Sequence, residues 1–178
     1  ADIYRADYQP GVKLYVNRVF ITDDDKELLP TWLRFVKGVI DSSDLPLNVS
    51  REILQQNRIM AKIKSNSVKK VLDKIKTISK NKEKYEGFYN EFGRLLKEGV
   101  YQEFEHKEAL TDLLRFKSTK EDGYVSLQDY VDRMDSDQKS IYYITGTNES
   151  ALRESPLLEM YKDKNIEVLI LDDEIDEI

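Results

Sequence analysis

The sequence contains no cysteine and only one histidine among its 178 residues. Without cysteine there is no disulfide scaffold, no catalytic thiol and no zinc site built from thiolates. Because His106 is the lone histidine, a histidine-based catalytic triad and a histidine pair around a metal are also excluded. We therefore expect no resident metal, and the missing cysteine favours a reducing compartment.

Long apolar runs are also missing. The longest, residues 141–144 and 168–171, are far shorter than the ~18 residues that a membrane span requires, so we expect no membrane partner. The chain begins at Ala1, with neither an initiator methionine nor a basic segment followed by an apolar one. This beginning indicates a piece of a longer protein.

Charge is abundant but unevenly distributed. The chain has 28 Lys and Arg against 34 Asp and Glu, for a net charge of -6. Residues 51–84 hold eleven basic and three acidic residues, whereas residues 167–178 hold six acidic residues and no basic one. A basic helix over 58–84 leaves open an alternative function as a nucleic-acid-binding module. Against it, residues 51–84 lack the aromatic side chains on which bases stack.

The first half of the chain predicts two strands followed by a run of helices. Alternating apolar residues predict a strand over residues 11–21, with Val12, Leu14 and Val16 on one face. A first helical turn after Pro30 and a strand over 36–40 come next. A helix is then expected to begin near Val49 or Ser50. Three further helices are expected over residues 59–78, 82–98 and 106–116, and Gly99 would end the second of them.

The last third predicts a small α/β unit. Ser126 and Asp129 have the spacing of a capping box at the start of a helix that runs through Met134. A buried strand over 141–144, a helix over 149–160 and a buried strand over 166–171 then form a strand-helix-strand unit, for which we expect a parallel sheet.

Several residues that could carry chemistry have a simpler structural interpretation. His106 lies between Glu105 and Lys107, which is typical of an exposed helix surface. Gly146 follows a strand and precedes a helix, as in phosphate-binding loops, but without further glycines a structural turn is favoured over a self-contained nucleotide-binding domain. Strand-end turns are expected at residues 23–25 and 172–173, and a core position at Trp32.

Arg51 and Gln55 are the most informative candidates for a functional site. Four residues apart, they would share one face of a helix and could address a single ligand. The planar guanidinium fork suits a phosphate, and a neighbouring glutamine can orient a water molecule. A solvated helix start explains the same residues, so chemistry alone leaves both interpretations open.

Longer stretches of sequence carry a family resemblance. They are Arg18-Val-Phe-Ile-Thr-Asp23, Trp32-Leu-Arg-Phe-Val-Lys-Gly-Val-Ile-Asp-Ser-Ser-Asp44 and Leu45-Pro-Leu-Asn-Val-Ser-Arg-Glu-Ile-Leu-Gln55. With residues 88–99, 113–116, 141–145 and 166–169, they make nearly the whole chain resemble the middle domain of the heat shock protein 90 chaperone family, bacterial type. The resemblance implies an α/β fold with a large α/β/α sandwich part, truncated at its N-terminus, a helical connector and a small α/β/α part. We assign these parts to residues 1–81, 82–115 and 116–178.

The same resemblance implies a function and its residues. Arg51 would reach the γ-phosphate of ATP held in a separate N-terminal domain, with Gln55 supporting that contact, Asn48 shaping the loop and Phe20 meeting that domain. The chain would be no enzyme alone but part of a cytoplasmic chaperone ATPase that uses ATP with Mg. Its partners would be the N-terminal ATPase domain, a C-terminal dimerisation domain that makes the intact protein a homodimer, and unfolded client proteins, with no nucleic acid.

The resemblance also implies that the first strands of the large part are missing from the chain. The strand over 11–21 would then expose unpaired backbone groups and lose apolar cover. We expect it to pair with the same strand of another copy.

Overall fold

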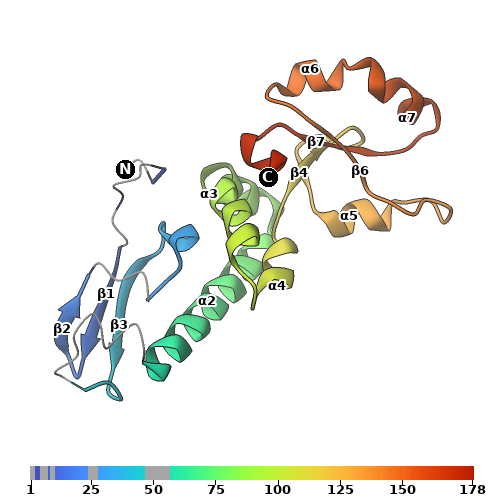
Figure 1. Cartoon of the computed structure of the whole chain (residues 1–178). Helices are drawn as coiled ribbons and strands as arrows, with labels where there is room; N and C mark the ends of the chain where they lie inside the picture. Colours follow the sequence, from blue (N-terminus) through green and yellow to red (C-terminus); the bar gives the residue numbers. More distant parts are fainter. Residues whose placement is uncertain (1–2, 5–7, 9–10, 24–27, 47–56) are drawn as a thin grey trace. The chain divides into compact units, whose positions relative to one another are not determined.

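The computed structural model describes residues 3–4, 8, 11–23, 28–46 and 57–178. The chain divides into two compact units, residues 1–77 and 78–178, and each is described by itself (Figure 1). Both are mixed α/β, which confirms the predicted fold class. The finer division at residues 81 and 115 stays a prediction.

The first unit contains a three-stranded sheet in the order β2-β1-β3 (Figure 1). β1 spans Gly11–Val16, β2 spans Val19–Thr22 and β3 spans Lys37–Ser42. The single strand expected over 11–21 is therefore wrong, because it is a hairpin of two antiparallel strands. β1 is the central strand and also pairs in parallel with β3, so it is not the unpaired edge that self-association would require.

A two-residue turn at Asn17 and Arg18 closes the hairpin. Both residues adopt positive φ, 49° and 66°, which is the conformation of the tight turns that match strand twist. The Asn17 amide donates to the Ser42 carbonyl oxygen at 3.0 Å, and the Arg18 amide donates to Asp41 Oδ1 at 3.2 Å. This turn could not be predicted from the sequence because Arg18 occupies the second turn position, where glycine is usual.

The main apolar core residues of the first unit come from β1, the 3-10 helix after Pro30 and the long helix that follows. Val12, Leu14 and Val16 are buried along β1, as their alternation predicts. Trp32, in the 3-10 helix η1 (Thr31–Leu33), is fully buried, which confirms it as a core residue. α2 (Arg58–Ser79) matches the helix expected over 59–78, and it buries Met60, Val68, Leu72 and Ile75 along one face.

The second unit begins with two helices whose ends differ from expectation. α3 spans Lys82–Gln102, so Gly99 lies inside it and does not end it; the Gly99 carbonyl accepts from the Glu103 amide at 2.7 Å. α4 spans only Lys107–Thr111. The expected helix over 106–116 is too long because Phe116 already belongs to a strand, and pairing with a distant strand overrides local helix preference there.

A four-stranded sheet in the order β5-β4-β7-β6 forms the centre of the second unit. β4 spans Phe116–Ser118, β5 Tyr124–Val125, β6 Tyr142–Thr145 and β7 Val168–Leu171. β6 and β7 are parallel, as predicted. β4 is antiparallel to both β5 and β7, and neither β4 nor β5 was predicted, since two or three residues are too few to show a period.

Helices cover both faces of this sheet (Figure 1). On one face, Tyr130 of α5 (Leu127–Asp132) packs with Val125 and Leu169. On the other, Leu158 packs with Val168 and Ile170. Consecutive side chains of β7 thus lie in cores on opposite faces of the sheet. A sheet with helices packed on both faces is the small α/β/α architecture.

The helix expected over 149–160 is wrong as one element, because it is broken into three. α6 spans Glu149–Arg153, η2 Pro156–Leu158 and α7 Glu159–Asp163. Pro156 has no amide to continue the helical bonds, and Ser155 caps the new start by accepting from the Leu157 amide. The last element, η3 (Glu174–Glu177), is capped by Asp173, which confirms the turn after β7.

A buried carboxylate ties these elements together. Glu167, which is 4% exposed, accepts two hydrogen bonds from the Arg133 guanidinium at 2.6 and 3.1 Å and one from the Ser118 hydroxyl. The Tyr130 hydroxyl donates to the Glu167 carbonyl oxygen at 2.6 Å and accepts from the Tyr142 amide at 3.0 Å. α5 and β4 therefore meet at Glu167, just before β7, and β6 is joined to them through Tyr130.

None of the helices in the described part of the chain combines the length and apolar composition needed to cross a membrane.

Replacing Arg18 by glycine should stabilise the first unit. A side chain at positive φ costs about 1 kcal/mol, and the greater freedom of glycine in the unfolded chain offsets part of this gain, so we expect a net increase of about 0.5 kcal/mol. Both hydrogen bonds of the turn are made by backbone amides and survive the change. Urea unfolding followed by the fluorescence of Trp32, the only tryptophan, measures it.

The matched control is Lys13→Gly, at an exposed position of β1 that lacks positive φ. There the free energy of unfolding should fall by about 0.5–1 kcal/mol. Equal effects of the two substitutions would contradict the role given to the turn.

Candidate functional site

Most residues predicted for the phosphate contact lie outside the described residues. Asn48, Arg51 and Gln55 all belong to residues 47–56, as does the helix start expected near Val49. On either side, β3 ends at Ser42 and α2 begins at Arg58. Leu45 is buried and Pro46 is exposed just before this stretch. The shared face of Arg51 and Gln55 therefore stays a prediction.

Phe20 is the one predicted contact residue that the structure describes. It lies on β2 and is 50% exposed, and its ring meets the Tyr15 ring edge-on at 5.7 Å. The preceding Val19 is equally exposed. Consecutive side chains of a strand point to opposite faces, so Phe20 and Val19 expose apolar surface on different sides of this outer strand, and Phe20 is the exposed aromatic one.

The basic stretch follows the outer face of α2. This helix has seven basic residues and one acidic residue, and most of the basic ones are exposed, opposite the buried Met60, Val68, Leu72 and Ile75. α2 contains no aromatic residue. Its pattern is that of an amphipathic helix with a solvated face, which does not favour the nucleic-acid alternative.

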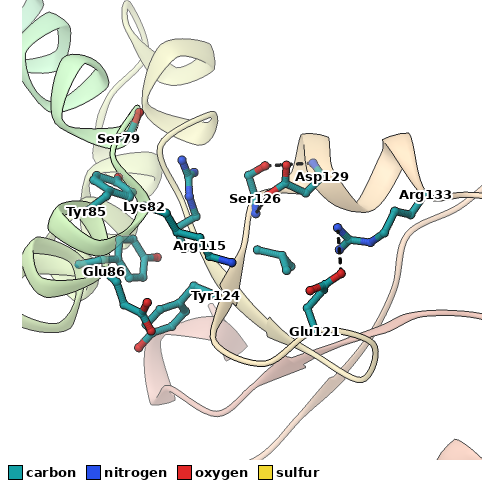
Figure 2. A pocket seen from close by; sticks show the side chains of 12 residues that line it. Ser79, Lys82, Tyr85, Glu86, Arg115, Glu121, Tyr124, Ser126, Asp129 and Arg133 are labelled. Carbon is teal, nitrogen blue, oxygen red and sulfur yellow. Dashed lines mark hydrogen bonds and ion pairs between the residues drawn. The ribbon is translucent and has the colours of Figure 1, made fainter.

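The second unit contains a polar pocket of about 450 Å³ (Figure 2). Tyr85, Glu86 and Tyr124 lie on one side of it, and Glu121 and Arg133 lie on the other. The Arg115 guanidinium lies 4.7 Å from the centre of the Tyr85 ring, a cation-π contact. Arg115 also donates to the carbonyl oxygens of Asp112 and Leu114, so its position is fixed.

Burial governs the titration of the pocket tyrosines. It raises the pKa of Tyr85 to about 12, and the nearby positive charge of Arg115 opposes part of the rise. Burial also raises the pKa of Tyr89, whose ring lies 5.2 Å from that of Tyr124. Both phenols are therefore neutral near neutral pH and are not general bases.

The capping box forms one wall of the pocket. The Ser126 amide donates to Asp129 Oδ2, and the Asp129 amide donates to Ser126 Oγ, both at 3.0 Å (Figure 2). This arrangement confirms the predicted box. Hydrogen bonding from the Ser126 backbone is the largest cause of an Asp129 pKa below its usual value.

Sequence reasoning missed this pocket because three separate elements bring its walls together. Tyr85 and Tyr89 come from α3, Tyr124 from β5, and Ser126 begins α5. The available signal was the aromatic run at helical spacing in α3, which continues through Phe88 and Phe92. That run predicts a packed helix face but not the strand residue that completes the wall.

The other candidate residues have structural roles. The Gly146 amide donates to the Leu171 carbonyl oxygen, and a Cβ on Gly146 would lie 2.8 Å from Leu152 Cδ2. Gly146 thus extends the β6–β7 pairing where a side chain would clash, which is a structural role, although the turn itself stays a prediction. His106 is half-buried before α4, with Nε2 3.8 Å from Glu105, so the expected exposed position is wrong. Within the described ranges, no group of three or more His, Cys, Asp or Glu could hold a metal.

Comparison with known proteins decides the family. Residues 1–178 match the family model described as Hsp90 protein. The chain belongs to the Hsp90 family. The chaperone proteins HtpG of Treponema denticola and Aliarcobacter butzleri are each 65% identical to it, over 182 and 180 residues. Each alignment covers 99% of this chain, which spans 28% of the length of these relatives.

A solved structure places the chain within the Hsp90 architecture. The middle domain of a Plasmodium falciparum heat shock protein resembles it with a TM-score of 0.81 and 34% sequence identity, covering 97% of this chain and 67% of that one. The predicted likeness to an Hsp90 middle domain, bacterial type, is confirmed.

The contribution of the Asp129 carboxylate to the stability of the second unit should be lost in acid. Because the folded-state pKa of Asp129 is depressed, its contribution to stability is complete above the unfolded value of about 3.9 and is lost as the pH falls through the lower folded value. Urea midpoints from circular dichroism between about pH 5 and 2 should therefore fall less steeply in Asp129→Asn, which cannot titrate, than in the unmodified chain. Identical slopes would contradict this assignment.

Proposed function

We propose that this chain is the middle domain of an ATP-dependent chaperone and supplies Arg51 to the γ-phosphate of ATP bound in a separate N-terminal domain. The match of the whole chain to the Hsp90 family, together with its likeness to a solved middle domain, carries the proposal. Relatives that are 65% identical have the name chaperone protein HtpG. Client proteins, the C-terminal dimerisation domain, a homodimeric intact protein and a cytoplasmic location belong to the same proposal.

The chemistry follows from what the transfer of a phosphoryl group needs. Negative charge spreads over the phosphoryl oxygens in the transition state, and a positioned guanidinium stabilises it. In the proposal Arg51 has this role, Gln55 supports the same contact and Asn48 shapes the loop. ATP and its Mg belong to the other domain, so this chain hydrolyses nothing alone.

Docking of the two domains would make hydrolysis depend on conformation. Arg51 can act only when the N-terminal domain lies against this one. The exposed Phe20 on β2 supports such a contact, because burying an exposed aromatic side chain favours association. Phe20 is therefore proposed as a docking residue and not as a catalytic one.

Substituting Arg51 should abolish most ATP turnover without preventing ATP binding. A suitable host is the Treponema denticola HtpG in which this chain replaces the matching 28%, since the two are 65% identical. Arginine fingers contribute roughly 10³ to 10⁵ in rate, an upper guide to the loss in Arg51→Ala. Gln55→Ala should lose less. Steady-state phosphate release and nucleotide binding are measured on the same chimera.

Arg58→Ala is the matched control, since Arg58 is an exposed arginine at the start of α2 and should leave the rate unchanged. An Arg51→Ala chimera that turns over ATP at the unmodified rate would remove Arg51 from the mechanism. Loss of nucleotide binding in that variant would instead assign Arg51 to ATP affinity.

By itself, the chain should bind ATP no more tightly than millimolar. Its sequence offers no glycine-rich phosphate cradle, and the Gly146 amide is already bonded to the Leu171 carbonyl oxygen. Isothermal calorimetry of ATP with Mg into the isolated chain tests this, with the N-terminal domain of the relative as the positive control. Micromolar binding of ATP to the isolated chain would contradict the proposal that only the N-terminal domain binds the nucleotide.

A further inference from the structure

The outer strand of the second sheet has backbone groups available for pairing. β6 lies at the end of the order β5-β4-β7-β6 and pairs with β7 alone among the described strands. The Gly146 amide points to β7, where it donates to Leu171. Because orientation alternates along a strand, Ile144 also points inward, whereas the amide and carbonyl groups of Tyr143 and Thr145 point outward. No hydrogen bond to these outward groups occurs within the described part of the chain.

This edge lacks the usual protection against pairing. Charged residues make up 35% of the chain, yet residues 140–148 contain none. Proline is absent from the same stretch, and the β6–β7 register is regular, without a bulge. Natural edges are commonly blunted by charges, proline, bulges or a very short strand. The opposite edge, β5, is only two residues long and follows the acidic Glu121 and Asp122.

Apolar side chains flank the edge on both faces of the sheet. Tyr143 is 64% exposed and pairs across the ladder with Leu169, which packs on the α5 face, where Val131 is also exposed. On the other face the Tyr142 ring contacts the Tyr161 ring at 5.1 Å, and the neighbouring Met160 is exposed. A strand added beside β6 would therefore find apolar contacts above and below its backbone.

We infer that the β6 edge binds an extended, apolar segment of a non-native protein, which joins the sheet as a further strand. The inference rests on the proposed chaperone function and names a client-contact surface. Pairing through backbone groups is independent of sequence, which suits a protein that must accept many clients. The uncharged edge favours apolar segments over charged ones.

A second copy of the chain is a poorer occupant. Two copies that each carry a net charge of -6 repel one another. Only Tyr143 and Thr145 of β6 offer outward groups, which is a small contact for two folded units but a sufficient start for a flexible segment. Self-association through β6 would appear in the experiment below as protection that depends on the concentration of the chain.

Amide hydrogen exchange resolves the pairing residue by residue. The probe is a capped ten-residue peptide of alternating valine and threonine, titrated into the ¹⁵N-labelled chain and followed by NMR. Exchange at Tyr143 and Thr145 should slow at least tenfold, while exchange at Ile144 and Gly146, already bonded toward β7, should stay unchanged. Side-chain contact alone would not produce this alternation.

Two variants separate backbone pairing from ring contact. Tyr143→Pro removes one outward amide without touching the bonds to β7, since proline is tolerated on an edge strand, and should weaken peptide binding at least tenfold. Tyr143→Phe keeps the amide and the ring and should bind like the unmodified chain. If the proline variant does not fold, the same peptide with every backbone nitrogen methylated replaces it and should not bind.

Three results would overturn the inference. They are equal binding of the methylated peptide, uniform slowing along β6, and slowing at Tyr143 and Thr145 that depends on chain concentration without peptide, which would make a second copy the occupant. ATP turnover in the Arg51 chimera is independent of all three. Arg51-dependent turnover without peptide binding would refute only the edge, and peptide binding with an Arg51-independent rate would refute only the ATPase role.

Discussion

The second unit depends on one buried carboxylate at the start of β7. The Glu167 side chain is almost fully covered and accepts hydrogen bonds from the Arg133 guanidinium and the Ser118 hydroxyl. A buried carboxylate is costly unless its oxygens are hydrogen-bonded, so the bonds from Arg133 at the end of α5 hold this helix beside β7. Tyr130 reinforces this position through the Glu167 carbonyl oxygen and links it to the Tyr142 amide.

The two surfaces available for binding in this unit follow from that constraint. Arg133 faces the pocket, where it also lies 3.9 Å from Glu121, so the same guanidinium anchors β7 and forms a pocket wall. Tyr142 begins β6, and the bond between its amide and Tyr130 fixes where the outer strand starts. β7 contributes side chains to both cores, and its neighbour β6 is the outer strand of the sheet.

The first unit follows a different rule, in which local backbone geometry decides what is exposed. The turn at Asn17 and Arg18 folds β2 back along β1, so the chain cannot continue as one long strand. Phe20 consequently lies on an outer strand, half-exposed, and not in the core with Leu14 and Val16. This exposure supports the docking role in the proposed ATPase, where Arg51 and its domain partner must meet.

The sequence alone determined the family, the fold class, the parallel pair β6–β7, the core position of Trp32 and the capping box at Ser126, because periodicity, cap spacing and long motifs are local properties. Tertiary structure decided the rest. β4 and β5 exist because distant strands pair with them, and the tyrosine pocket exists because α3 and β5 meet. Glu167 looked like an ordinary acidic residue until folding buried it against Arg133, since burial and pairing arise from contacts between residues far apart in the chain.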